Sequence, residues 1–108
     1  MATGILRVWR GWTTHENADA YEAIVSGQVL PGIAARDTPL GSRKGRARRE
    51  LESETEFSTM MIFDSLDDVR RFAGEDYETA YVPPEARAVL ARFDEQSAHY
   101  EILLRPEL

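Results

Sequence analysis

His99 is the residue of this chain that points most directly to catalysis, because imidazole titrates near physiological pH. It lies in the segment SAHYEILL, where a strand would place Glu101 on the same face as His99. A histidine in an apolar pocket can remove a phenolic or enolic proton, and the resulting anion can react with oxygen without a metal or a flavin. The alternative is a structural histidine that hydrogen-bonds across a sheet or a subunit interface.

The segment ILRVWRGW, residues 5–12, carries two arginines and two tryptophans in a pattern typical of a strand. Alternation puts Arg7 and Trp9 on one face and Arg10 and Trp12 on the other, and both faces are apolar. At most one arginine is expected to point into an apolar interior, where a cation needs a carboxylate or an anionic ligand. Either arginine would stabilise an anion at the site, and the tryptophans would shape an apolar pocket. Alternation leaves open which face meets that pocket.

Two further aromatic residues, Tyr77 and Tyr81, lie in the long connection EDYETAYVPPEARAVLARF. Long connections in compact domains are often functional, so these rings are expected to line the mouth of a pocket. They would equally well fill space against a partner subunit. The expected substrate-binding residues are therefore Arg7, Trp9, Arg10, Trp12, Tyr77 and Tyr81.

The charge of the chain restricts its partners. Acidic residues outnumber basic residues by 19 to 13, and this excess argues against a nucleic-acid-binding protein. The basic stretch RKGRARR, residues 43–49, is interpreted as a strand whose charges pair with glutamates of the same hairpin. The alternative is a phosphate or nucleic-acid patch, but the stretch lacks the aromatic residues that stack on bases.

The composition also restricts cofactors and location. The chain has no cysteine, and His15 and His99 are too far apart for a paired-histidine motif, so no metal is expected. The sequence shows no glycine-rich phosphate loop, and no other cofactor is expected. No apolar run approaches the roughly 20 residues that span a bilayer, and no signal peptide is visible. We therefore expect a cytoplasmic protein that does not contact a membrane.

The hydrophobic pattern predicts strands and helices in the order β-α-β-β-α-β. The expected elements are a strand at 5–12, a helix within 13–24, two strands within 43–63 with a turn at 52–54, a helix at 66–74, a short helix that begins at Pro84, and a strand at 97–104. Asp64 or Ser65 would cap the helix at 66–74, and Gly74 would end it. This order is typical of a ferredoxin-like α+β fold: one domain, residues 1–108, with a four-stranded antiparallel sheet and helices on one face.

The sheet face opposite the helices is expected to be apolar as well, because both alternating sets of strand residues contain apolar side chains. An exposed apolar sheet face normally marks an interface or a ligand surface. Packing two such sheets together as a homodimer would bury this face and enclose a barrel-like space. The alternative is a sheet with a mixed surface and no partner.

The stretches ILRVWRGWTT, ADAYEAI and VLPGIAAR, followed by residues 48–102, resemble small proteins of the antibiotic biosynthesis monooxygenase family over nearly the whole chain. The resemblance implies a dimeric α+β barrel and a cofactor-independent monooxygenase that acts on an aromatic or polyketide-like small molecule. In such an enzyme, His99 would be the base. Two alternatives stay open: a non-catalytic small-molecule-binding or structural homodimer, and a haem-degrading monooxygenase. For the latter, Asn17, Trp9 or Trp12, and His99 supply the residue types without matching the positions of the motif.

Overall fold

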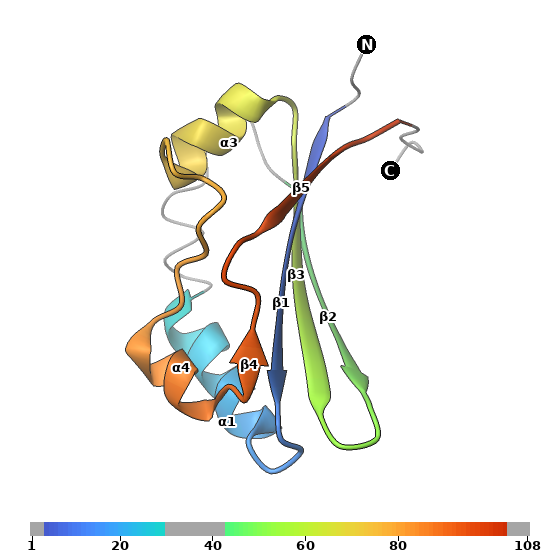
Figure 1. The fold of residues 1–108 in the computed structure, drawn as a ribbon, viewed down its shortest axis with the longest axis vertical. Helices are drawn as coiled ribbons and strands as arrows, with labels where there is room; N and C mark the ends of the chain where they lie inside the picture. The colour runs from blue at the N-terminus through green and yellow to red at the C-terminus, as the bar shows by residue number, and fades with distance from the viewer. Residues whose placement is uncertain (1–3, 30–42, 104–108) are drawn as a thin grey trace.

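The computed structural model of the chain describes residues 4–29 and 43–103. These residues form an α+β fold in which helices cover one face of an open antiparallel sheet (Figure 1). The expected α+β class is confirmed, and the arrangement is consistent with a ferredoxin-like fold. No helix in these two segments is long and apolar enough to cross a membrane.

The sheet has five strands within the described residues. They are β1 (Ile5–Thr13), β2 (Arg43–Glu50), β3 (Thr55–Phe63), β4 (Arg92–Phe93) and β5 (Ala98–Glu101). Their order is β2-β3-β1-β4, β5 also pairs with β1, and every pair is antiparallel. The sequence pattern predicted four strands, because it did not identify β4. It also extended the last strand to residue 104, which lies outside the described residues, whereas β5 ends at Glu101.

The helices of the described segments lie on one side of the sheet (Figure 1). They are α1 (Ala18–Ile24), which continues into the π-helical turn η1 (Val25–Val29), α3 (Leu66–Ala73) and α4 (Pro84–Val89). The side chain of Ser65 accepts a hydrogen bond from the backbone N–H of Asp68 at 3.2 Å and so caps α3. Gly74, with a φ of 89°, ends that helix, and Pro84 lies in the first turn of α4. These three predictions of helix ends are confirmed.

Alternation along β1 assigns its residues to the two faces of the sheet. Ile5 and Trp9 pack against hydrophobic clusters that include helix residues, so Arg7, which lies between them, is on the helix-covered face as well. The opposite face, which no described helix covers, carries Leu6, Val8, Arg10 and Trp12. We call this second surface the uncovered face.

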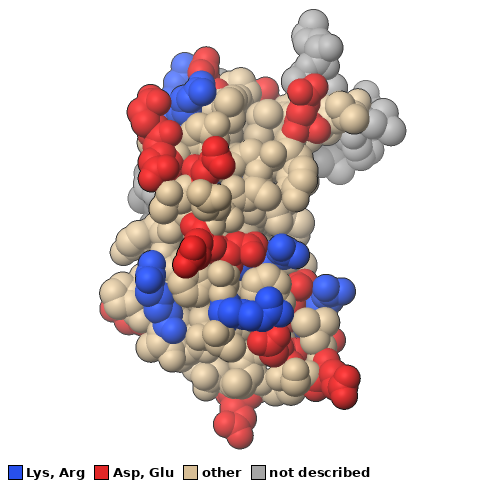
Figure 2. All heavy atoms as spheres, in the orientation of Figure 1, with Lys and Arg blue, Asp and Glu red and all other residues tan. Residues whose placement is uncertain are grey.

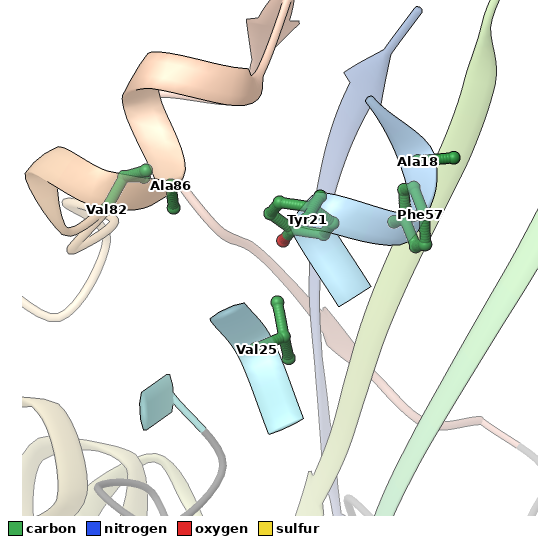
Figure 3. Packing of buried hydrophobic residues seen from close by; sticks show 6 residues of the cluster. All are labelled: Ala18, Tyr21, Val25, Phe57, Val82 and Ala86. Carbon is green, nitrogen blue, oxygen red and sulfur yellow. The ribbon is translucent and has the colours of Figure 1, made fainter. Parts of the chain in front are cut away.

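Two hydrophobic clusters hold the helices against the sheet. In the first, Tyr21 of α1 packs on Phe57 of β3 with ring centroids 4.7 Å apart, and Val82 and Ala86 close the cluster from the α4 side (Figure 3). In the second, Phe63 of β3 and Phe72 of α3 have ring centroids 5.5 Å apart and pack with the fully buried Val69. Strand β3 contributes to both clusters and therefore fixes both groups of helices.

Candidate functional site

A bulge interrupts the sheet edge that pairs with β1. Phe93 pairs with Gly11 and Ala98 pairs with Val8. The edge therefore advances by five residues where β1 advances by three. The two extra residues form a bulge at 94–97 and separate β4 from β5. Bulges are common beside active sites because they redirect side chains and end regular pairing.

The bulge is joined to the connection between α3 and α4. The Glu95 carbonyl accepts a hydrogen bond from the Ala80 N–H at 2.9 Å, and the Ser97 N–H donates to the Glu78 carbonyl at 2.7 Å. These bonds fix the connection against the sheet edge. Tyr77, which directly precedes the bonded segment, is thereby placed beside β5.

His99, Arg7 and Tyr77 meet on the helix-covered face. Arg7 and His99 lie opposite each other on β1 and β5, and Arg7 Nη1 is 2.9 Å from His99 Nε2. The same Nη1 donates to the Tyr77 carbonyl at 2.6 Å, and the Tyr77 and His99 rings meet edge to face with centroids 5.0 Å apart. A guanidinium can only donate, so His99 Nε2 accepts this hydrogen bond and the ring proton lies on Nδ1.

The surroundings of His99 favour its neutral form. Burial is the main factor that lowers the pKa of His99 below its ordinary value of 6.5, and the positive charge of Arg7 lowers it further. The carboxylate of Glu78 and a hydrogen bond with the Ser97 backbone raise the pKa without reversing the shift. These surroundings favour the uncharged imidazole, which is the state that a general base requires.

A cleft of about 490 Å3 lies beside His99, between β5 and the start of α3. Its lining consists of Ile5, Leu66, Tyr77, Glu78 and residues 96–101. This volume falls within the range of roughly 300–1,000 Å3 that is typical of small-molecule sites. The structure thus brings together three of the residues singled out from the sequence: His99 and Tyr77 line the cleft, and Arg7 is hydrogen-bonded to both.

Trp9 is not among the residues that line this cleft. It packs against the cluster around α1 and α4, and its indole N–H donates to the Asp94 carbonyl at 2.7 Å. Its ring lies so close to Gly11 that a β-carbon there would come within 2.7 Å of Trp9 Cη2. The indole therefore satisfies a backbone group of the bulge and has a structural role.

Arg10 and Trp12 lie on the uncovered face, on the opposite side of the sheet from the cleft. Arg10 Nε pairs with Asp94 Oδ2 at 3.2 Å, and the Arg10 guanidinium carbon is 5.3 Å from the Trp12 ring centroid. The guanidinium of Arg92 stacks on the same ring at 4.0 Å. Of the two arginines of the first strand, Arg7 therefore faces the helices, while Arg10 reaches an acid on the other side.

Tyr81 is 77% exposed and does not form part of the cleft lining. The cleft instead contains two glutamates, Glu78 and Glu101, that were not predicted as site residues. Alternation along the last strand already placed Glu101 on the same face as His99. Glu78 gave no such signal, because its position depends on hydrogen bonds to a bulge that the sequence pattern did not indicate.

The basic stretch at residues 43–49 forms ion pairs with glutamates. Arg46 pairs with Glu22 at 2.8 Å, Arg48 with Glu50 at 3.0 Å and Arg49 with Glu56 at 3.0 Å. Two of these pairs lie within the β2–β3 hairpin, as the interpretation of a paired strand requires, and the third reaches α1. His15 Nδ1 lies 2.9 Å from a carboxylate oxygen of Glu50 and so belongs to the same network.

In the described part of the chain, no three His, Cys, Asp or Glu side chains are grouped so that they could hold a metal ion. No family model matches the chain, and no curated protein matches it either.

Proposed function

We propose that this chain is a homodimeric, cofactor-independent monooxygenase whose aromatic or polyketide-like substrate binds in the cleft beside His99. The observation that carries the proposal is the position of His99, which lines an open cleft with its Nε2 2.9 Å from the guanidinium of Arg7. A neutral imidazole can accept a proton, and a neighbouring cation stabilises the anion that remains.

In the proposed reaction, a substrate methylene group next to a carbonyl or a phenol ring loses a proton to His99 Nε2. The carbanion adds molecular oxygen to form a peroxide, which takes the proton back and loses water to leave a ketone. The net change is CH2 + O2 → C=O + H2O, with oxygen as the oxidant. His99 must exchange its hydrogen bond with Arg7 for one with the substrate, and the Arg7 N–H then faces the anion.

The same hydrogen bond favours a second candidate function. His99 Nε2 already accepts from Arg7, so the lone pair that a base would use is occupied before substrate arrives. A protein that only binds a small molecule in this cleft would keep that bond intact. Haem degradation gains no comparable support, since the Asn17 amide donates to the Val89 carbonyl and the Trp9 indole to the Asp94 carbonyl, away from His99.

Oxygen uptake separates the two candidates. Anthrones and hydroxynaphthalenes are first selected as compounds that raise the midpoint of thermal unfolding, because a ligand of the native state stabilises it. We expect at least one such compound, 1,8-dihydroxyanthrone being the first to test, to consume one molecule of oxygen per quinone formed, faster than in buffer alone. Compounds that bind without any uptake above the buffer rate would favour the non-catalytic binding protein.

The homodimer is proposed to form through the uncovered face. One part of this face is apolar and carries Leu6, Val8, Met60, Ile62, Ala98 and Tyr100. Tyr100 is 55% exposed in the single chain, which a sheet-to-sheet contact would bury. The pairing of apolar strands around a two-fold axis would give each copy the same buried patch.

Val8→Lys is expected to weaken this dimer by about 30-fold or more, because Val8 lies between Met60 and Ala98 at the centre of the apolar patch. Light scattering across a concentration series measures the effect, and the unchanged chain should give twice its mass of 12.2 kDa at micromolar concentration. Tyr81→Lys, at a highly exposed position outside this patch, is the control. A chain that is monomeric, or a Val8→Lys variant that dimerises normally, would contradict the proposed interface.

A further inference from the structure

We infer that the ligand of the His99 cleft carries a positively charged amino group in addition to its acidic hydroxyl or methylene group. This inference rests on the proposed function only in taking the cleft as the binding site. It names a substrate class, an amine-bearing phenol or enol, that the monooxygenase proposal leaves open. The charges that line the cleft are the reason.

Among the described residues that line the cleft, only two carry charged side chains, Glu78 and Glu101. Glu101 lies two residues after His99, on the same face of β5, and Glu78 follows Tyr77 in the connection fixed by the bulge. Both side chains are exposed. The cleft lining therefore combines two exposed carboxylates with the less exposed imidazole of His99.

These two carboxylates differ from those of the β2–β3 hairpin. Glu50, Glu54 and Glu56 each form an ion pair with an arginine of the described chain. Within residues 4–29 and 43–103, by contrast, no ion pair or side-chain hydrogen bond joins Glu78 or Glu101 to another residue. Their charges are thus available to a ligand. An unpaired carboxylate in the lining of a site attracts cations and repels anions.

The surface at the end of β5 agrees with this charge. Figure 2 shows acidic side chains there, separated by uncharged surface from α3, where acidic and basic side chains lie together. Most Lys and Arg side chains in this view lie lower, near α4 and β4, among further acidic ones. The guanidinium of Arg7 is hydrogen-bonded to His99 Nε2 and is not among the residues that line the cleft. The described lining therefore carries negative charge, and a cation adjoins the imidazole.

This polarity orients a ligand as well as selecting it. An ammonium group would remain near Glu78 and Glu101, and the hydroxyl or methylene group would point to His99, where Arg7 stabilises the anion. A ligand with a carboxylate in place of the amine would instead be repelled, because its negative charge would lie near those of Glu78 and Glu101. Haem, with two propionates, belongs to that disfavoured class.

Three phenols of the same size test the inference: tyramine, neutral 4-ethylphenol and 3-(4-hydroxyphenyl)propionate. Binding is followed through the NMR signals of the His99 ring at pH 7.5 and low salt. We expect tyramine to bind tightest and the propionate weakest, with about fivefold between successive compounds. In the double variant Glu78→Gln plus Glu101→Gln, the three affinities should converge to within about twofold. The control, Glu52→Gln plus Glu85→Gln, changes the net charge equally outside the cleft and should keep the full ranking.

Equal or tighter binding of the propionate overturns the inference, as does a ranking that survives in the Glu78→Gln plus Glu101→Gln variant. A His99 signal that none of the three phenols perturbs at millimolar concentration overturns it as well. The proposed oxygenase is judged separately by oxygen uptake. If uptake fails while the ranking holds, the cleft remains a site for cationic phenols and only the catalytic proposal falls.

Discussion

Gly11→Ala is expected to lower the free energy of unfolding by about 1–3 kcal/mol, because a β-carbon at this position has no room. It would lie 2.7 Å from Trp9 Cη2 and 3.0 Å from Leu90 Cδ2. Neither neighbour can move freely. The Trp9 indole is held by its hydrogen bond to the Asp94 carbonyl, and Leu90 packs against the cluster around α1 and α4. The added methyl group must therefore displace the indole, the bulge or the end of α4.

Urea unfolding, followed by circular dichroism at one protein concentration, measures this loss. Gly45→Ala is the matched control, since Gly45 also lies in a strand but a β-carbon added there would meet no atom within 4 Å. That substitution should leave stability unchanged or raise it by about 0.5–1 kcal/mol, because it restricts the unfolded chain. If Gly11→Ala proved as stable as the unchanged protein, the close packing of Trp9 over the strand would be wrong.

The ends of α3 could be predicted from the sequence because local chemistry determines them. Ser65 offers a side-chain oxygen to the first turn, and Gly74 adopts a positive φ that other residues disfavour. The same holds for the β2–β3 hairpin, where two long alternating segments flank a polar turn. Such features need no information from distant parts of the chain.

The bulge at 94–97 could not be predicted in this way. Strand β4 has only two residues, too few to show any alternation, and it exists because Trp12 and Gly11 of β1 pair with it. The bulge is stabilised by the Trp9 indole and by the connection after α3, both distant in sequence. Residues of the cleft that depend on this bulge, Glu78 above all, were missed for the same reason.

Alternation along β1 predicted which residues share a face of the sheet, and it left open which face the helices cover. Alternation correctly separated Arg7 from Arg10, but it carries no information on which face the helices cover. Only the packing of Ile5 and Trp9 against the helices decides that Arg7 lies with His99. The tryptophans were expected in a pocket for their apolar rings. Their N–H groups instead bind the Asp94 carbonyl and the Glu56 carboxylate, because a buried indole requires an acceptor.

His99→Ala is expected to reduce turnover of any true substrate by about 10²- to 10⁴-fold, the usual contribution of a general base. The substrate should still bind, because the cleft and its glutamates remain. His15→Ala is the control: it removes the other histidine of the chain, which lies in the hairpin network and not in the cleft. Oxygen uptake at saturating substrate measures the effect, and circular dichroism checks the fold. Undiminished turnover in folded His99→Ala would exclude His99 as the base.

The pH dependence of kcat/KM tests more specifically whether His99 is the base. Burial, and then Arg7, lower the pKa of His99, so kcat/KM should rise with pH to a plateau whose midpoint lies below 6.5. Arg7→Met removes one of these two causes and should move the midpoint upward, while burial keeps it from rising fully to 6.5. The free energy of unfolding should also rise with pH in this range. Between the pKa of His99 in the folded protein and 6.5, the unfolded chain binds more protons than the folded chain, so lowering the pH destabilises the native protein. A midpoint above 6.5, or one that Arg7→Met leaves in place, would show that the proton is taken by another group.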